Sequence, residues 1–212
     1  MKDFITIKEN VSSEIVEKKS KFIANLFYVE SVKEAEEIIK QTNKKYFDAR
    51  HNCIAYRIVE DEQIVEKSSD NGEPSGTAGA PMLNILQKNN LANVLVIVTR
   101  YFGGILLGTG GLVRAYSNSL LQAIENSTIV EKCIGQELKV VLEYSEFENF
   151  KYYCKNNDIN IVNSQYSENI VCKIEAQEAQ KQRLLEDFQS KNIKLIDICE
   201  LSKKYITKSK EK

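Results

Sequence analysis

Residues 94–116 read VLVIVTRYFGGILLGTGGLVRAY, and this stretch decides how the N-terminal part of the chain folds. Its first five residues, 94–98, form the most continuous apolar run of the chain, which indicates a strand buried on both faces. Arg100 and a glycine-rich segment, 103–111, follow directly, and the apolar residues after it recur at helical spacing. The stretch therefore predicts a buried strand, a glycine-rich loop and then a helix.

This strand–glycine–helix layout can bind a phosphate or another anion. Glycines let backbone N–H groups approach an oxyanion, and the positive end of the helix dipole adds to the attraction. Thr109 is a candidate cap of the helix, and Arg114 is expected near its first turns. Residues 108–111, GTGG, lack the GK[ST] ending of a Walker A motif, and no GxGxxG register is present. The alternative is that the glycines only let a loop fold tightly over the sheet.

Acidic residues are missing from a long stretch around this segment. The chain has 29 basic and 30 acidic residues, yet no Asp or Glu occurs between Glu73 and Glu125. The only charged residues in that interval are Lys88, Arg100 and Arg114. The interval therefore favours anionic over cationic ligands, although the net charge of −1 makes any basic surface a local one.

A second loop, residues 69–77 (SDNGEPSGT), precedes a predicted helix that contains Met82 to Leu86. Ser75 and Thr77 could make its N-terminus a second anion site, with Thr77 as the cap. Asp70 and Glu73 could instead form an acid pair, but two carboxylates without further ligands make a weak metal site. The simplest interpretation is a turn followed by a helix cap, and no metal site is predicted.

His51 is the only histidine of the chain, and it lies two residues before Cys53 on a predicted strand over 52–59. The two side chains should share one side of that strand. A nucleophilic Cys–His pair needs a separation of about 3 Å, which neighbours of this kind usually exceed. Metal binding would need more ligands, and Asp48 is the only candidate nearby. Two interpretations stay open for His51: a structural histidine, and a catalytic or metal-binding one.

Tyr101 and Phe102 stand beside Arg100, where they could stack on a nucleic-acid base. The alternative is one aromatic ring in the core and one on the surface. The cysteines at 133, 154, 172 and 199 lie in apolar patterns and are expected in the core. The chain has five cysteines and no CxxC, which argues against a disulfide framework or a zinc site and favours a reducing cytoplasm.

The composition is typical of a globular protein, with 42% apolar and 28% charged residues among 212. No apolar run approaches the roughly 18 residues of a membrane span. The N-terminus, MKDF, shows no secretory pattern. We therefore expect a cytoplasmic protein without a membrane segment.

The remaining pattern predicts an α+β protein of two domains that meet at Gly135. In domain 1–134 we expect strands over 12–18, 22–29, 52–59, 63–68, 93–99 and 128–134, a turn at 60–62, and helices after Ser31, Thr77 and Gly111. In domain 135–206 we expect the order βαββαβ, with strands over 137–144, 159–166, 169–176 and 193–205 and helices over 146–156 and 177–190. Residues 207–212 form a predicted basic tail.

Several blocks of residues resemble the YigZ/IMPACT family. They are residues 18–24 (KKSKFIA), 49–57 (ARHNCIAYR), 69–79 (SDNGEPSGTAG), 98–104 (VTRYFGG) and 107–116 (LGTGGLVRAY). The resemblance spans residues 15–125, and the part after residue 137 matches the bacterial members in pattern and length more than in identity.

The resemblance implies two folds and a role in translation. The N-terminal domain would have a ribosomal-protein-S-five-domain-two-like fold, whose left-handed crossover is rare. The C-terminal domain would be ferredoxin-like, and the tandem would be similar to the last two domains of elongation factor G. Eukaryotic members regulate translation by competing, through protein–protein contact, for the activator of the general-control kinase. Bacterial members are implied to bind nucleic acid or the ribosome, and neither an enzymatic activity nor a cofactor comes with the family.

Three functions remain open: a binder of RNA or the ribosome, a module that docks a translation-associated protein, and an enzyme. We expect a non-enzymatic cytoplasmic regulator linked to translation that binds through a glycine-rich surface from Arg100 to Arg114. The expected binding residues are His51, Ser69, Glu73, Ser75, Thr77, Arg100, Tyr101, Phe102, Gly103, Gly104, Gly108, Thr109, Gly110, Gly111 and Arg114. The alternative is an enzyme for a small anionic or phosphorylated substrate, with His51, Asp70 or Glu73 as acid or base.

Overall fold

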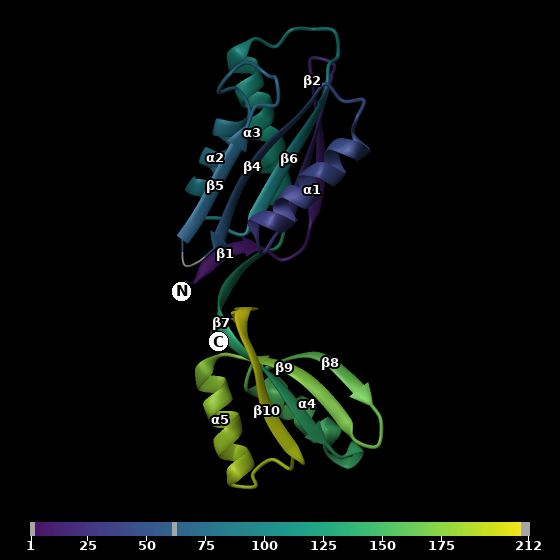
Figure 1. The fold of residues 1–212 in the computed structure, drawn as a ribbon, viewed down its shortest axis with the longest axis vertical. Coiled ribbons are helices and arrows are strands. Elements are labelled where there is room, and N and C mark those ends of the chain that lie inside the picture. The colour runs from purple at the N-terminus through teal and green to yellow at the C-terminus, as the bar shows by residue number, and fades with distance from the viewer. Residues whose placement is uncertain (1–2, 61–62, 209–212) are drawn as a thin grey trace. The chain divides into compact units, whose positions relative to one another are not determined.

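The computed structural model describes residues 3–60 and 63–208, which form two compact units (Figure 1). One unit comprises residues 4–130. The other comprises Asp3 together with the described residues from 131 onward. The predicted boundary at 134 lies close by, but two strands predicted on either side of Gly135 are one strand, β7 (Ile129–Leu142). The predicted turn at 60–62 and the end of the predicted tail, residues 209–212, fall partly or wholly outside the described residues.

The N-terminal unit is built on a five-stranded sheet in which all neighbouring strands are antiparallel. In spatial order the strands are β2 (Val11–Glu17), β3 (Ser20–Tyr28), β6 (Val94–Tyr101), β4 (His51–Glu60) and β5 (Gln63–Ser69). A short strand, β1 (Phe4–Ile7), was not predicted, and its Ile5 forms a single parallel bridge to Leu91.

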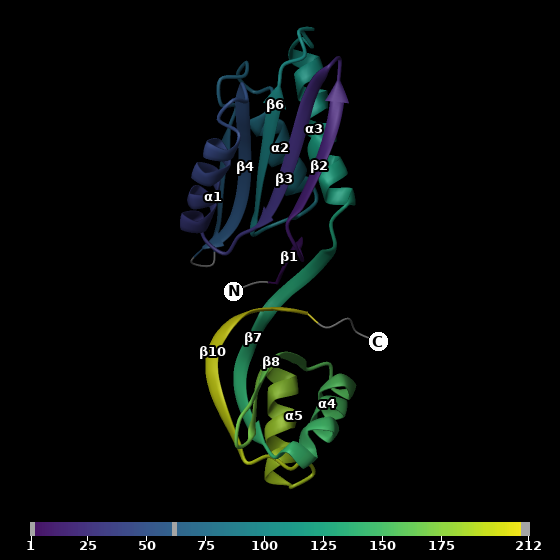
Figure 2. The same cartoon turned by 90° about the vertical axis from the view of Figure 1, so that its right-hand side faces the viewer.

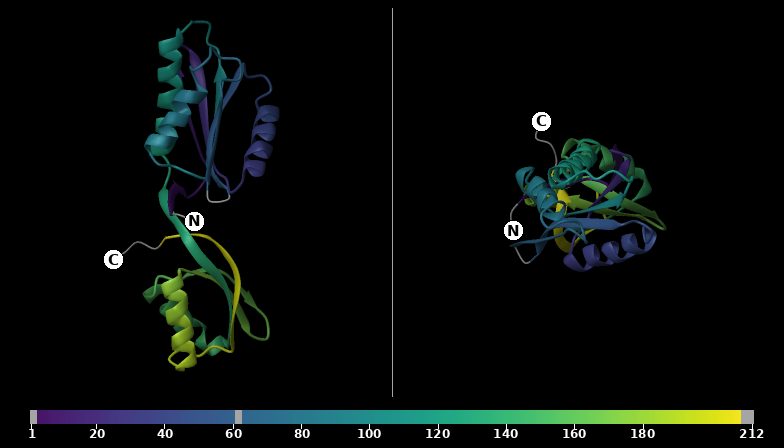
Figure 3. Two further views of the ribbon diagram at one scale, coloured as in Figure 1. Left: turned by 60° about the vertical axis from the view of Figure 1, so that its left-hand side comes forward. Right: turned by 90° about the horizontal axis from the view of Figure 1, so that it is seen from above.

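Helices cover both faces of this sheet, with α1 (Val32–Lys45) on one face and α2 (Gly79–Lys88) and α3 (Thr109–Glu125) on the other (Figures 2 and 3). The central strand β6 consequently sends alternate side chains into two cores. Val94, Val96 and Val98 pack with α2 and α3, whereas Leu95 and Ile97 pack on the α1 side. This arrangement confirms the prediction that the apolar run is buried on both faces.

Local sequence signals explain how two of the helices begin. Ser31 caps α1 by accepting a hydrogen bond from the backbone N–H of Glu34, as predicted. Pro81 lies in the first turn of α2, where its missing N–H costs nothing. The predicted caps Thr77 and Thr109 were wrong. The N-cap residues are Ala78 and Gly108, which make no side-chain cap bond.

The C-terminal unit has the predicted order βαββαβ. After β7 come α4 (Phe147–Asn156, preceded by a 3₁₀ turn at Tyr144–Glu146), β8 (Asn160–Tyr166), β9 (Ile170–Ala176), α5 (Glu178–Gln189) and β10 (Asp197–Thr207). The strand order is β10–β7–β9–β8, and every neighbouring pair is antiparallel.

Two predictions for this unit need correction. Cys133, Cys154 and Cys172 are buried as expected, but Cys199 is exposed because it lies on the edge strand β10. The described part of the predicted tail is ordered, since Thr207 ends β10 and the Lys208 ammonium pairs with Asp3 and Glu131. No helix among the described residues is long and apolar enough to cross a membrane.

The turn between β2 and β3 packs directly on the backbone that follows β6. The N–H of Gly103 donates a hydrogen bond to Ser20 Oγ (3.2 Å), and a Cβ on Gly103 would overlap the carbonyl group of Lys19. Only glycine allows so close an approach of two backbones.

We predict that Gly103→Ala lowers the free energy of unfolding by about 2 kcal/mol or more, because the turn or the loop must move. Gly110→Ala is the matched control, since a Cβ there meets no atom within 4 Å. The control should be neutral or stabilising by up to about 1 kcal/mol, because alanine favours helices. Urea unfolding of both variants checks this, and equal stabilities would contradict the packing described.

Candidate functional site

A cavity of about 590 Å³ lies in the N-terminal unit, where three segments meet. The first segment is the start of β4 with the adjacent end of β6. The other two are a loop of residues 70–78 (the acidic loop) and residues 102–108 (the glycine loop). The ionisable lining residues are Arg50, His51, Glu73 and Arg100, and the apolar ones are Pro74, Phe102, Leu106, Leu107 and Leu112. Gly72, Gly108 and Thr109 complete the lining.

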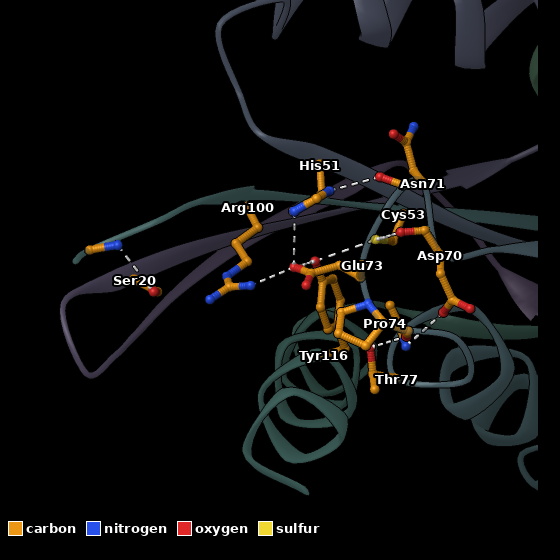
Figure 4. Close-up of polar contacts among 12 residues, drawn as sticks. Ser20, His51, Cys53, Asp70, Asn71, Glu73, Pro74, Thr77, Arg100 and Tyr116 are labelled. Atoms are coloured by element: carbon orange, nitrogen blue, oxygen red, sulfur yellow. Dashed lines mark hydrogen bonds and ion pairs between the residues drawn. The ribbon is translucent and has the colours of Figure 1, made fainter. Parts of the chain in front are cut away.

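A buried ion pair joins two of these segments (Figure 4). Arg100 Nη1 lies 2.6 Å from Glu73 Oε1, and the two side chains are only 6% and 3% exposed. Register places His51 directly opposite Arg100 on the adjacent strand. The acidic loop therefore reaches over the sheet and neutralises the arginine at the end of its central strand.

Glu73 has further partners on α3 and β4. The phenol of Tyr116 donates a hydrogen bond to Glu73 Oε1 (2.9 Å), and His51 Nε2 lies 3.8 Å from the same oxygen. His51 Nδ1 is 2.7 Å from the carbonyl oxygen of Asn71. Because a carbonyl only accepts, Nδ1 must carry a proton, and a second proton on Nε2 would complete an ion pair with Glu73.

Cys53 lies beside this cluster and is buried. Its thiol is 2.9 Å from the carbonyl oxygen of Asp70 and 3.3 Å from the Tyr116 hydroxyl. Burial raises the pKa of Cys53 to about 12, so the thiol stays protonated at neutral pH. Burial, with smaller contributions from Cys53 and Glu73, also raises the pKa of Tyr116, which keeps the phenol a hydrogen-bond donor.

Asp70 has a structural role, which the sequence did not indicate. Its carboxylate accepts backbone hydrogen bonds from Gly76 (2.8 Å), Ala78 (2.9 Å) and Gly79 (2.8 Å). Burial acts to raise its pKa, but these three donors outweigh burial and lower the pKa of Asp70 below its usual value. Asp70 thus caps the start of α2 in place of Thr77, whose hydroxyl donates to Pro74 instead.

The predicted surface from Arg100 to Arg114 is not one exposed basic surface. Arg100 is buried because it ends the central strand of a sheet covered on both faces, and Glu73 neutralises it. Arg114 is exposed on α3 but does not line the cavity. Lys88 ends α2 near the start of β6, whereas Arg100 lies at the other end of that strand.

Of the two adjacent aromatic residues, only Phe102 belongs to the cavity. Its ring is 40% exposed, and the guanidinium carbons of Arg50 and Arg100 lie 5.8 and 5.6 Å from its centroid. Tyr101 is half-buried, and its hydroxyl donates to Asp48 (2.9 Å). Neither ring lies in the core, so the alternative of one buried and one exposed ring was wrong.

The structure gathers part of the predicted site and leaves part outside it. His51, Glu73, Arg100, Phe102, Gly108 and Thr109 line one cavity. Ser69, Ser75, Thr77, Tyr101, Gly103, Gly104, Gly110, Gly111 and Arg114 are not among its lining residues. Among the described residues, no group of three or more His, Cys, Asp or Glu side chains could hold a metal ion.

Sequence reasoning missed several residues of the cavity and its support, and three of them show why. Arg50 was a detectable candidate, because it precedes His51 within the block ARHNC. Leu106 is 82% exposed, which a pattern of apolar residues in a loop does not reveal. Tyr116 reads as an ordinary inward-facing helix residue, and only the fold shows that its hydroxyl meets Glu73.

Comparison with known proteins places both units. Residues 18–124 match the Impact N-terminal domain, and residues 140–191 match a domain of unknown function, DUF1949. The chain is 40% identical to the IMPACT family member YvyE of Bacillus subtilis, over 79% of this chain and 76% of that protein. It is 34% identical to the IMPACT family member YigZ of Escherichia coli, over 86% of this chain and 92% of that protein.

A solved structure described as that of a hypothetical protein is similar over both units. It covers 92% of this chain and 97% of its own, with a TM-score of 0.62 and 32% sequence identity.

We predict that Glu73→Gln and Arg100→Gln each destabilise the fold by about 3–5 kcal/mol, because each leaves a buried group without its partner. The double variant should lose clearly less than the sum of the two, which a double-mutant cycle in urea would measure. The exposed pair Glu14–Lys21 (2.8 Å) on β2 and β3 is the control, with an expected coupling below about 1 kcal/mol. Strictly additive losses at Glu73 and Arg100 would show that the pair is not a coupled unit.

Proposed function

This chain belongs to the IMPACT family, and from that premise we propose that it is a non-enzymatic cytoplasmic regulator linked to translation. It acts by docking a translation-associated protein at the mouth of the cavity. In this proposal the N-terminal unit has the ribosomal-protein-S-five-domain-two-like fold. The C-terminal unit, whose order βαββαβ is that of a split βαβ, has the ferredoxin-like fold.

The observation that carries the proposal is the exposed apolar rim of the cavity. Leu106 is 82% exposed and Phe102 is 40% exposed, and Ile105 between them in the chain is exposed as well. Contiguous apolar side chains in water mark surfaces that other proteins cover. Here they border a cavity in which the Glu73–Arg100 ion pair holds the charged side chains in place. The surface therefore combines exposed apolar area with a defined shape.

RNA binding fits the same surface less well. Binding to a phosphate backbone depends on several cations that are free to contact it. Glu73 neutralises Arg100, and Arg114 lies outside the cavity. The net charge of −1 provides no general attraction for nucleic acid either.

An enzyme acting on a small anionic or phosphorylated substrate is the second candidate function. The ionisable side chains of His51, Glu73 and Arg100 in one cavity favour it. Three features argue against it. The Cys53 thiol stays protonated, and Asp70 is occupied by three backbone donors. In addition, Glu73 Oε1 already accepts hydrogen bonds from Arg100 and Tyr116.

We predict that the protein co-sediments with bacterial ribosome-associated material, and that Leu106→Asp weakens this by about tenfold or more. A charge on the rim opposes an apolar contact, so the loss should be similar at about 50 and about 200 mM salt. Ile64→Asp is the matched control, because Ile64 is also exposed but pairs with Val59, far along β4 from His51. It should sediment as the wild type does.

Two results would contradict the proposal. Binding that disappears at the higher salt or after ribonuclease treatment, and that Leu106→Asp does not affect, would support RNA as the target. An absence of co-sedimentation under every condition would exclude a stable partner in the translation apparatus.

A further inference from the structure

The N-terminus of α3 opens beside the cavity without a side-chain cap. Its N-cap residue is Gly108, and the first backbone bond of the helix runs from the N–H of Leu112 to the carbonyl of Gly108. Within the described part of the chain, the N–H groups of Thr109, Gly110 and Gly111 have no acceptor. Together with the helix dipole, such N–H groups favour an anion.

An orphaned donor in the cavity wall points independently to a missing acceptor. The Arg100 side chain is only 6% exposed and lines the cavity. Its Nη1 binds Glu73, but its Nε, which is buried, has no hydrogen-bond partner among the described residues. A buried donor without a partner is costly, so a ligand that supplies an acceptor would regain that free energy.

Gly110 has no role that the fold explains. Its φ is not positive, and a Cβ at this position would meet no atom within 4 Å. Glycine in a helix is less favourable than alanine. The absent side chain leaves open space at the second residue of α3, next to the cavity-lining Thr109, and a group from outside can approach the backbone there.

The charge and the apolar walls of the cavity determine which chemical group can bind there. The cavity is lined by two guanidinium groups, of Arg50 and Arg100, and by one carboxylate, of Glu73, so it has one excess positive charge before His51 is counted. A phosphomonoester carries nearly two negative charges at neutral pH, whereas a carboxylate carries one. The walls beside these cations are apolar, with Phe102 and Leu106 at the rim. The cavity therefore suits one carboxylate attached to an apolar body.

We propose that this cavity is a carboxylate subsite at the N-terminus of α3, with Arg100 and Arg50 beside the anion and Phe102 and Leu106 against its apolar part. The inference rests on the proposed function. In the partner protein, the carboxylate is that of an acidic side chain within an apolar segment.

The test is an NMR titration of the full-length, ¹⁵N-labelled protein with 4-phenylbutyrate. The amide signals of Gly110 and Gly111 should shift in a saturable way. The uncharged 4-phenylbutyramide should not shift them, and inorganic phosphate should shift them less. Gly110→Ala should weaken binding of 4-phenylbutyrate by about tenfold while keeping or raising the unfolding temperature. Asn118→Ala, an exposed change on the same helix, is the control and should bind normally.

Three outcomes would overturn the inference: no shift of these amides, a stronger response to phosphate, or normal binding by Gly110→Ala. The titration needs no partner, so its result is separable from that of the proposed function. Co-sedimentation that depends on Leu106, without a carboxylate response, removes only the subsite. A carboxylate response without co-sedimentation removes only the link to translation.

Discussion

The buried ion pair between Glu73 and Arg100 is the interaction on which the rest of the site depends. Two side chains that are 3% and 6% exposed meet at 2.6 Å. Either charge alone in that position would be strongly destabilising, so neither can leave while the other stays. Through Glu73 the pair also binds Tyr116 on α3 and approaches His51 on β4. Segments that are far apart in the chain are thereby held around one cavity.

The same pair determines what the cavity can recognise. The pair neutralises the charge of Arg100 and fixes its side chain in the cavity wall, which argues against phosphate contacts at that residue. The positive character that remains comes from Arg50 and the uncapped start of α3, while the exposed rim around Leu106 is apolar. A cavity with ion-paired side chains inside and an apolar rim suits a protein segment better than a nucleic-acid backbone.

The sequence predicted features whose causes are local. The run at residues 94–98 implied burial on both faces, and Ser31 implied a helix start, because periodicity and capping act over a few residues. Prediction from the sequence failed where the residue that makes the deciding contact is distant in the chain. The burial of Arg100 depends on Glu73, 27 residues away, and α2 is capped by Asp70, from outside the helix. Gly135 read as a boundary, but it lies within β7, where a Cβ would overlap Ile206.

Hydrogen exchange of the Glu73→Gln variant tests the central claim most directly, namely that the Glu73 carboxylate, paired with Arg100, ties the acidic loop to α3 through Tyr116. In this variant the amides of residues 73–79 and 112–116 should both exchange about tenfold faster or more, because both segments lose the contact between Glu73 and Tyr116. Residues 137–176 in the other unit should keep wild-type exchange. Faster exchange in 73–79 alone, with 112–116 unchanged, would contradict the account.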